Sequence, residues 1–382
     1  MSSVYFHIPF CKQACYYCDF HFSTGRTRIA EMLDCLLLEW ERLYPVLGNG
    51  VVDSLYFGGG TPSILPPHEL SRIILAVRSR VALRSDAEIT LEVNPDDVTP
   101  AYLAGIAGLG INRLSLGIQS LNDTHLRAMN RAHDGETALR ALHWVLESSI
   151  SRVSVDLMYG LPGLTEDEWG STLEQMADLG VSHVSAYGLT LEPGTVWHHR
   201  VQQKRLILPD DECGRRQYSI LMEFAERRGY RHYEVSNLAL PGMESQHNSA
   251  YWSGASYLGI GPSAHSYVDG VRWWNVSNNA RYIKEIKAGD LPRTREILTP
   301  CNLHNEYVMT RLRMDNGMDL AEYEERFGAR FGRGLFEQLN GIDPGWWALE
   351  AGRLRLTREG RFFADGISAR LFADDAECTQ EA

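Results

Sequence analysis

Short apolar runs alternate with segments of helical periodicity over the first half of this chain, and this alternation restricts the fold more than any other feature. Six such runs precede residue 190, at 4–8, 52–57, 88–93, 112–117, 152–160 and 183–189. Strands that alternate with helices form parallel sheets with crossover helices. The sequence therefore predicts an α/β fold, an open or partial (β/α)6 barrel whose chemistry lies at the carboxyl ends of the strands.

The pattern loosens after about residue 200. Residues 208–230 have the periodicity of a helix, and residues 235–276, rich in Gly, Ser and Trp, predict a long functional loop region. Near the end, 349–372 predicts a short strand and turn before a helix, as in a winged-helix-like module. We expect four parts: a barrel domain (1–200), a connecting region (201–300), a smaller, mainly helical C-terminal module (301–370) and a disordered tail (371–382).

Composition excludes several classes of function. A formal net charge of −12 disfavours nucleic acid and anionic lipid as partners. No apolar run reaches the roughly 18 residues that a membrane helix needs. The first ten residues have no basic and apolar leader, and a cysteine cluster follows them directly. These features favour a cytoplasmic protein, and they leave open peripheral contact with the inner face of the membrane.

Three cysteines lie close together in "HIPFCKQACYYCDFHF", residues 7–22. Cys11, Cys15 and Cys18 are spaced CxxxCxxC in an expected loop, and thiolates at this density bind zinc or iron and sulfur. With His7 or His21 as a fourth ligand, a structural Cys3His zinc site is one interpretation. The other is a [4Fe-4S] cluster that leaves one iron open to a small molecule, and the spacing favours it.

Two further motifs follow the second and third apolar runs, "YFGGGTPS" at 56–63 and "LEVNP" at 91–95. Together with the cysteines they resemble the radical SAM superfamily. The resemblance implies a [4Fe-4S] cluster whose open iron binds S-adenosylmethionine. The glycines suit this role because a residue without Cβ lets the backbone approach a ligand closely.

The same resemblance implies the residues that hold these cofactors. Cys11, Cys15 and Cys18 would hold the cluster, and the S-adenosylmethionine residues would be Tyr5, Tyr17, Gly59, Gly60, Thr61, Glu92, Gln119, Arg131 and Asp156. Glu92 can accept from amino or hydroxyl groups, and Arg131 suits a carboxylate by charge and fork geometry. Asp156 suits the ribose hydroxyls. No residue is assigned a catalytic role.

The resemblance extends further, to the coproporphyrinogen dehydrogenase-like group, through "DLMYGLPG", "SAYGLTLEPGT" and "YEVSNLAL". Within that group, the oxygen-independent coproporphyrinogen oxidase carries an additional cysteine two residues beyond the third. That position is Phe20 in this chain. The difference disfavours coproporphyrinogen oxidase activity.

A second discriminating motif is "QHNSAYW" at 246–252, which matches the HNxxYW motif of the HemW family of haem chaperones. The match implies haem as a ligand, with His247 on the iron and Tyr251 and Trp252 against the macrocycle. His265 is a less favoured ligand. Taken alone, the motif would instead indicate a capped loop with two buried aromatic side chains.

Three functions stay in competition on the sequence alone. The favoured one is a haem chaperone that binds haem and delivers it to membrane-bound respiratory enzymes, on a scaffold that binds [4Fe-4S] and S-adenosylmethionine. The second is a radical enzyme acting on a tetrapyrrole, by oxidative decarboxylation of coproporphyrinogen III or by modification of haem. The third is a zinc-stabilised regulatory protein. Whether the protein is a monomer or a homodimer is left open.

Overall fold

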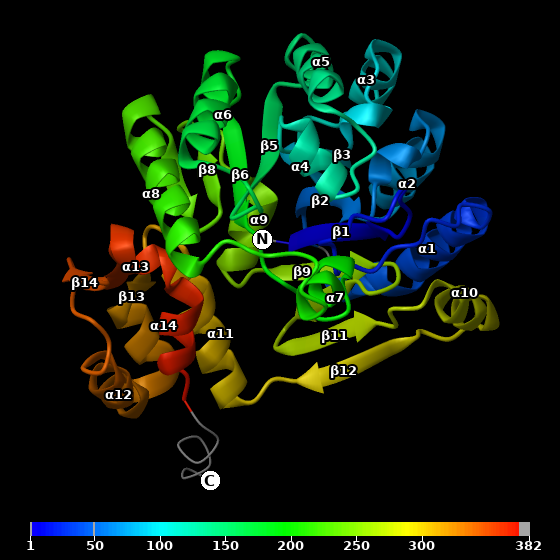
Figure 1. Cartoon of the computed structure of the whole chain (residues 1–382). Coiled ribbons are helices and arrows are strands. Elements are labelled where there is room, and N and C mark those ends of the chain that lie inside the picture. Colours follow the sequence, from blue (N-terminus) through cyan, green and yellow to red (C-terminus); the bar gives the residue numbers. More distant parts are fainter. Residues whose placement is uncertain (1, 49, 374–382) are drawn as a thin grey trace.

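The computed structural model describes residues 2–48 and 50–373, and its centre is a curved parallel sheet (Figure 1). Six strands lie side by side in chain order: β1 (Ser2–Ile8), β2 (Val52–Gly59), β3 (Leu83–Val93), β4 (Arg113–Gln119), β5 (Arg152–Tyr159) and β6 (His183–Gly188). All neighbouring pairs among them are parallel. The predicted partial (β/α)6 barrel is therefore confirmed.

Crossover helices cover the outer face of this sheet (Figure 1). They are α1 (Ile29–Leu43), α2 (Pro67–Arg80), α3 (Pro100–Ala107), α4 (Asp123–Ala128), α5 (Gly135–Leu146) and α6 (Glu166–Asp178). Several begin at a side-chain cap; Asp134 accepts from the N–H of Thr137 and Thr165 from that of Glu168. Such caps satisfy N–H groups that the first helical turn leaves unpaired.

The strands are apolar on their outer face and polar on their inner face, because successive side chains of a strand point to opposite sides. In β2, Leu55 and Phe57 are fully buried in the core beneath the helices. The alternate residues, Ser54 and Tyr56, point into the barrel, where they meet polar groups of other elements. The inner surface is thus available for chemistry while the outer one supplies the core.

The region 235–276 is not the long loop that its composition predicted. It contains β8 (Asn237–Ala239), α9 (Gln246–Trp252), β9 (Ser256–Ile260), β10 (His265–Val268) and β11 (Val271–Asn275). With β7 (Arg231–Glu234) and β12 (Arg293–Ile297), the strands extend both edges into a twelve-stranded sheet, β12-β11-β10-β9-β1-β2-β3-β4-β5-β6-β8-β7. The prediction failed because β9 and β8 join these short strands to the sheet by pairing with β1 and β6, which are far away in sequence.

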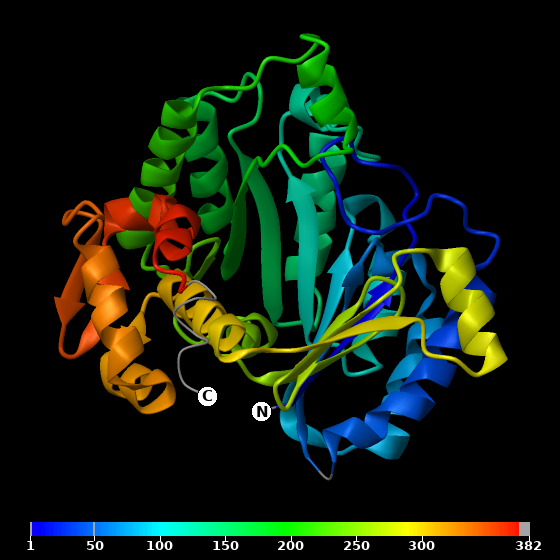
Figure 2. The ribbon, with the colours of Figure 1, turned by 90° about the horizontal axis from the view of Figure 1, so that it is seen from below.

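Three further helices complete this part of the chain: α7 (Val196–Gln202), α8 (Asp211–Arg228) and α10 (Asn279–Ala288). The helix predicted within 208–230 is α8. The short helix α9 lies inside the curve of the sheet and packs against β1 and β2 (Figures 1 and 2). It thereby brings His247 of the HNxxYW motif to the barrel interior.

The C-terminal module has its own small core and a three-stranded sheet of order β13-β15-β14. Its elements are α11 (Pro300–Arg313), β13 (Met318–Asp319), α12 (Leu320–Leu339), β14 (Trp347–Glu350), β15 (Arg353–Leu356), α13 (Arg358–Phe362) and α14 (Ala364–Arg370). Of the tail expected to be disordered, 374–382 lies outside the described residues. Within the described part of the chain, no helix is long and apolar enough to cross a membrane.

Candidate functional site

The cysteine loop follows β1 and is held in place from two sides. The N–H of Tyr16 donates to Met129 O at 3.0 Å, and the N–H of Trp197, in α7, donates to Tyr16 O at 3.0 Å. Cys11, Cys15 and Cys18 on this loop are half-buried free thiols. Elements distant in sequence therefore fix the three thiols at the carboxyl end of the barrel.

Asn130 also anchors the loop, and the sequence analysis missed it. Its Nδ2 donates to Ala14 O at 2.7 Å, and its Oδ1 accepts from Gln13 Nε2 at 2.8 Å. Its φ of 59° lies in the left-handed region, which Asn tolerates better than most residues. An Asn just after a short helix was the available signal.

Two side chains donate to the cysteine sulfurs. Thr61 Oγ1 lies 3.4 Å from Cys11 Sγ, and a guanidinium nitrogen of Arg131 lies 3.4 Å from Cys15 Sγ. Burial raises the pKa of Cys11 to about 11 and that of Cys18 to about 12. The Cys11 and Cys18 thiols are thus protonated at neutral pH, and a metal must displace their protons. The two donors would then stabilise the thiolates.

The histidines of the zinc interpretation are engaged elsewhere. Both ring nitrogens of His7 are hydrogen-bonded, Nδ1 with Tyr5 Oη at 3.1 Å and Nε2 with His21 O at 2.8 Å. The His21 ring bonds Asn279 Oδ1 at 2.7 Å. Across residues 2–48 and 50–373, no three His, Cys, Asp or Glu side chains surround a single ion position. The hydrogen bonds of His7 disfavour it as a fourth zinc ligand, and a [4Fe-4S] cluster takes each cysteine on a different iron.

The glycines of "GGGTP" make room mainly for the protein's own groups. Gly59 has φ +105°, and a Cβ there would lie 2.4 Å from the His7 ring. A Cβ at Gly60 would lie 2.7 Å from the carbonyl oxygens of Ile8 and Phe10. We expected these glycines to admit a ligand; the structure adds that they also let β1 and β2 approach each other beside the cysteine loop.

Two buried carboxyl groups face the interior. Glu92 accepts from Tyr56 Oη at 2.9 Å and from the N–H of Gly59 at 3.1 Å, and burial raises its pKa to about 7. Asp156 accepts from Ser115 Oγ at 3.0 Å, and burial raises its pKa to about 6. Both lie within strands, β3 and β5, where inward-pointing positions of a barrel strand face the cavity.

The remaining residues predicted for the S-adenosylmethionine site lie around the carboxyl end of the barrel. Gln119 ends β4 with φ 68°, a conformation strained for a residue with a Cβ. Tyr5 lies beside Tyr56, with ring centroids 5.9 Å apart, and Tyr17 Oη lies 3.5 Å from Arg131. The structure therefore brings the predicted cysteine, glycine, aromatic and charged residues of the barrel together at one end.

Arg131 links the cysteine loop to the ends of β3 and β4. One of its nitrogens donates to Asn94 Oδ1 at 2.8 Å and to Gly117 O at 2.7 Å. Asn94, which we did not predict, also donates to Thr61 Oγ1 at 3.2 Å. The Nε of Arg131 is buried and has no partner among the described residues. A free buried donor beside three thiols fits a ligand carboxylate there, so the residues present fit S-adenosylmethionine and its cluster.

His247 lies deeper in the barrel, on the first turn of α9. Ser54 Oγ donates to Ser3 Oγ at 2.9 Å and so accepts from Nδ1–H of His247 at 2.8 Å. The imidazole packs on the Tyr56 ring with centroids 4.8 Å apart. Burial lowers its pKa to about 4, so the ring is neutral. Its Nε2 keeps a lone pair and makes no hydrogen bond to a described residue.

The backbone that carries His247 is held by Glu88 of β3. Oε1 of Glu88 accepts from the N–H of His247 at 3.0 Å and Oε2 from that of Gln246 at 3.1 Å. Glu88 and its ionic partner Arg113, 3.4 Å away, are 0% and 2% exposed. A buried carboxylate thus fixes the start of α9, which neither the motif nor its spacing indicated.

Tyr251 and Trp252 lie at the other end of α9, away from Ser54 and Tyr56. Tyr251 is 43% exposed and lies 4.6 Å from Tyr257, ring to ring. The guanidinium of Arg313, in α11, lies 4.9 Å from the Trp252 ring. The motif is therefore a helix, neither a loop nor a pair of fully buried aromatics.

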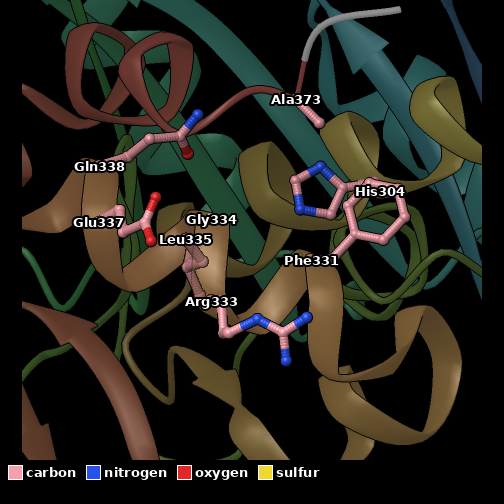
Figure 3. Close-up of a pocket in the computed structure, with 8 residues that line it drawn as sticks. All are labelled: His304, Phe331, Arg333, Gly334, Leu335, Glu337, Gln338 and Ala373. Carbon is pink, nitrogen blue, oxygen red and sulfur yellow. The ribbon is translucent and has the colours of Figure 1, made fainter. Parts of the chain in front are cut away.

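A separate pocket lies in the C-terminal module (Figure 3). It is lined by His304, Phe331, Arg333, Gly334, Leu335, Glu337, Gln338 and Ala373. None of the predicted site residues is among them. The candidate site is therefore the barrel interior.

Comparison with known proteins shows the family of this chain. The radical SAM superfamily model matches residues 5–176, and the HemN C-terminal domain model matches residues 298–363. The heme chaperone HemW of Mycobacterium tuberculosis is 35% identical over 377 residues, which cover 96% of this chain and 94% of that one. The chain belongs to the HemW family.

Other family members and a related structure extend this result. The heme chaperone HemW of Lactococcus lactis is 31% identical, and the match covers 98% of both chains. The structure of coproporphyrinogen III oxidase (HemN) from Escherichia coli, a radical SAM enzyme, aligns with a TM-score of 0.83 at 25% identity, over 97% of this chain and 90% of that one. The HemW-family chain and the oxidase therefore share the barrel and the C-terminal module.

Proposed function

We propose that this protein is a haem chaperone, which binds haem through His247 and delivers it to membrane-bound respiratory enzymes. The observation that carries the proposal is the state of His247, whose neutral ring is held by Ser54 and Tyr56 while Nε2 keeps a free lone pair. A neutral imidazole nitrogen is a common axial ligand of haem iron. The names of the relatives, heme chaperone HemW, support the same function.

The rest of α9 suits a flat, amphipathic ligand. Tyr251 is half-exposed, and Trp252 lies beneath Arg313, whose guanidinium is paired with Asp365 at 2.6 Å. The aromatic rings would contact the macrocycle. A single protein ligand on the iron would leave its opposite face open to a ligand from the acceptor.

Cys11, Cys15 and Cys18 would hold a [4Fe-4S] cluster, which supplies one electron to a bound S-adenosylmethionine. Around it, Arg131 would bind the ligand carboxylate, Glu92 would accept from its amino group, and Asp156 would accept from ribose hydroxyls. Tyr5, Tyr17, Gly59, Gly60, Thr61 and Gln119 would complete that site. We propose a cytoplasmic protein that meets its acceptors at the inner face of the membrane.

The test is an anaerobic haem titration followed by absorbance, with wild type, His247→Ala and His265→Ala compared. His265 is a matched control, because it is exposed, packs on Trp274, and lies on β10, which is separated from β1 by β9. We expect saturable binding of about one haem per chain in wild type and His265→Ala, and its loss in His247→Ala. Equal binding by wild type and His247→Ala would contradict the assignment.

The second candidate is an enzyme that acts on a tetrapyrrole, favoured by the structural similarity to HemN. Phe20 occupies the position of the additional cysteine and is 69% exposed. We expect no release of carbon dioxide from coproporphyrinogen III in the presence of S-adenosylmethionine and reductant. Turnover dependent on S-adenosylmethionine would favour the enzyme over the chaperone.

A further inference from the structure

One strand, β2, connects the two proposed binding sites. Its inward residues Ser54, Tyr56 and Gly58 follow one another at the two-residue period of a strand. Ser54 bonds His247, at the haem end. Gly58 lies beside Glu92, at the S-adenosylmethionine end, and Tyr56 stands between them.

Tyr56 contacts a residue of each site. Its ring lies 4.8 Å from the His247 imidazole, inclined by 31°, and its hydroxyl donates to Glu92 Oε1 at 2.9 Å. Burial raises the pKa of Tyr56 well above its usual value, so the hydroxyl remains a donor. The orientation of the Tyr56 ring, on which the imidazole packs, thus depends on whether Glu92 is ionised.

The contact between Tyr56 and Glu92 depends on Gly58. A Cβ at position 58 would lie 2.7 Å from Glu92 Oε1 and 2.8 Å from the Tyr56 ring. Both distances are shorter than van der Waals contact, so a side chain at this position would separate the two groups. The contact between Tyr56 and Glu92 therefore requires a glycine at position 58.

We propose that Tyr56 is a positioning residue that couples occupancy of the S-adenosylmethionine site to haem binding at His247. The proposal rests on the proposed function and adds a linkage between its two ligands. An ammonium group beside Glu92 favours the ionised carboxylate. An ionised acceptor strengthens the bond from Tyr56, which orders its ring and the imidazole packed on it. Haem then binds a more pre-organised ligand, and its affinity rises.

The experiment measures the haem Kd of cluster-reconstituted protein with and without saturating S-adenosylmethionine, without reductant. Wild type, Tyr56→Phe and Tyr102→Phe are compared. Tyr102→Phe removes a hydroxyl that donates to Leu65 O, outside the barrel interior. We expect S-adenosylmethionine to lower the haem Kd about five- to tenfold in wild type and Tyr102→Phe, and to leave it unchanged in Tyr56→Phe.

Two additional measurements separate coupling from misfolding. Iron and sulfide content should match wild type in Tyr56→Phe, and S-adenosylmethionine should shift the Soret maximum of bound haem in wild type and Tyr102→Phe but not in Tyr56→Phe. Gly58→Ala should also abolish the difference in Kd. By reciprocity, haem should lower the Kd of S-adenosylmethionine by the same factor.

Failure of the proposed function and failure of the coupling give different results. A wild type that binds no haem would overturn the proposed function and this inference together. A wild type whose haem Kd is the same with and without S-adenosylmethionine, or a Tyr56→Phe variant that keeps the full difference, would overturn the inference alone.

Discussion

At the scale of single residues, the surroundings of a cysteine decide whether its thiol is suited to bind metal. Cys15 receives a hydrogen bond from Arg131 at 3.4 Å, whereas the half-buried Cys213 of α8 lies 3.6 Å from the neutral amide of Gln217. Cationic donors stabilise a thiolate, which is the form that binds metal. The cysteine loop is therefore distinguished from the other described cysteines by its surroundings as well as its spacing.

Replacing Cys15 by Ala should remove the cluster, because three irons then have two protein ligands. We expect iron and sulfide content after anaerobic reconstitution to fall to background. Cys213→Ala, which removes a thiol of similar burial on α8, should keep full content. Retention of full iron and sulfide by Cys15→Ala would refute the role given to this loop.

At the scale of elements, α9 is a short helix that depends on the barrel for its position. Ser245 caps it by accepting from the N–H of Asn248, and Glu88 accepts from the preceding N–H groups, those of Gln246 and His247. A helix of seven residues has little stability of its own. The position of His247 thus depends on Glu88 of β3 as much as on α9 itself.

Replacing Glu88 by Ala should destabilise the fold by about 3 kcal/mol, because Arg113 would stay buried without its partner. Glu41→Ala removes an exposed carboxylate paired with the exposed Arg80 and should cost less than about 1 kcal/mol. Urea unfolding of the metal-free chain measures both. Equal effects would mean that the buried pair contributes no more than a surface one.

At the scale of the whole molecule, Glu39 joins the start of the chain to the strands added after residue 250. This fully buried side chain of α1 accepts from the N–H of Gly261 at 2.8 Å, from Asn275 Nδ2 at 2.6 Å and from Tyr282 Oη at 2.5 Å. Burial raises its pKa from 4.5 to about 7. The attachment of β9–β12 is therefore sensitive to pH.

The sign of this sensitivity follows from proton binding. Between pH 4.5 and 7 the folded chain keeps the Glu39 proton while the unfolded chain loses it, so stability falls as pH rises. We expect the free energy of unfolding of wild type, relative to Glu39→Gln, to fall by about 2 to 3 kcal/mol over this range. Urea titrations of both metal-free proteins measure it. A difference independent of pH would show that Glu39 titrates normally.

Local patterns predicted the parts of the molecule whose partners are near in sequence. The six βα units follow from hydrophobic periodicity, because each strand pairs with the next strand along the chain. The cysteines lie on the loop that follows β1, and "YFGGGTPS" spans the end of β2 and the turn after it. Parallel strands present these segments at one edge of the sheet. The functional groups at that edge could therefore be predicted from the sequence alone.

Only the tertiary structure decided the rest, because it depends on contacts between distant segments. The pairing of β9 with β1 turned an expected loop into part of the sheet, and the approach of α9 to β2 placed His247 on Tyr56. Glu88 and Asn130 belong to no quoted motif, and Asn94 lies in "LEVNP" without a role of its own there. The roles of all three arise from partners more than thirty residues away. The sequence by itself determined which groups the protein carries, and packing decided which of them meet.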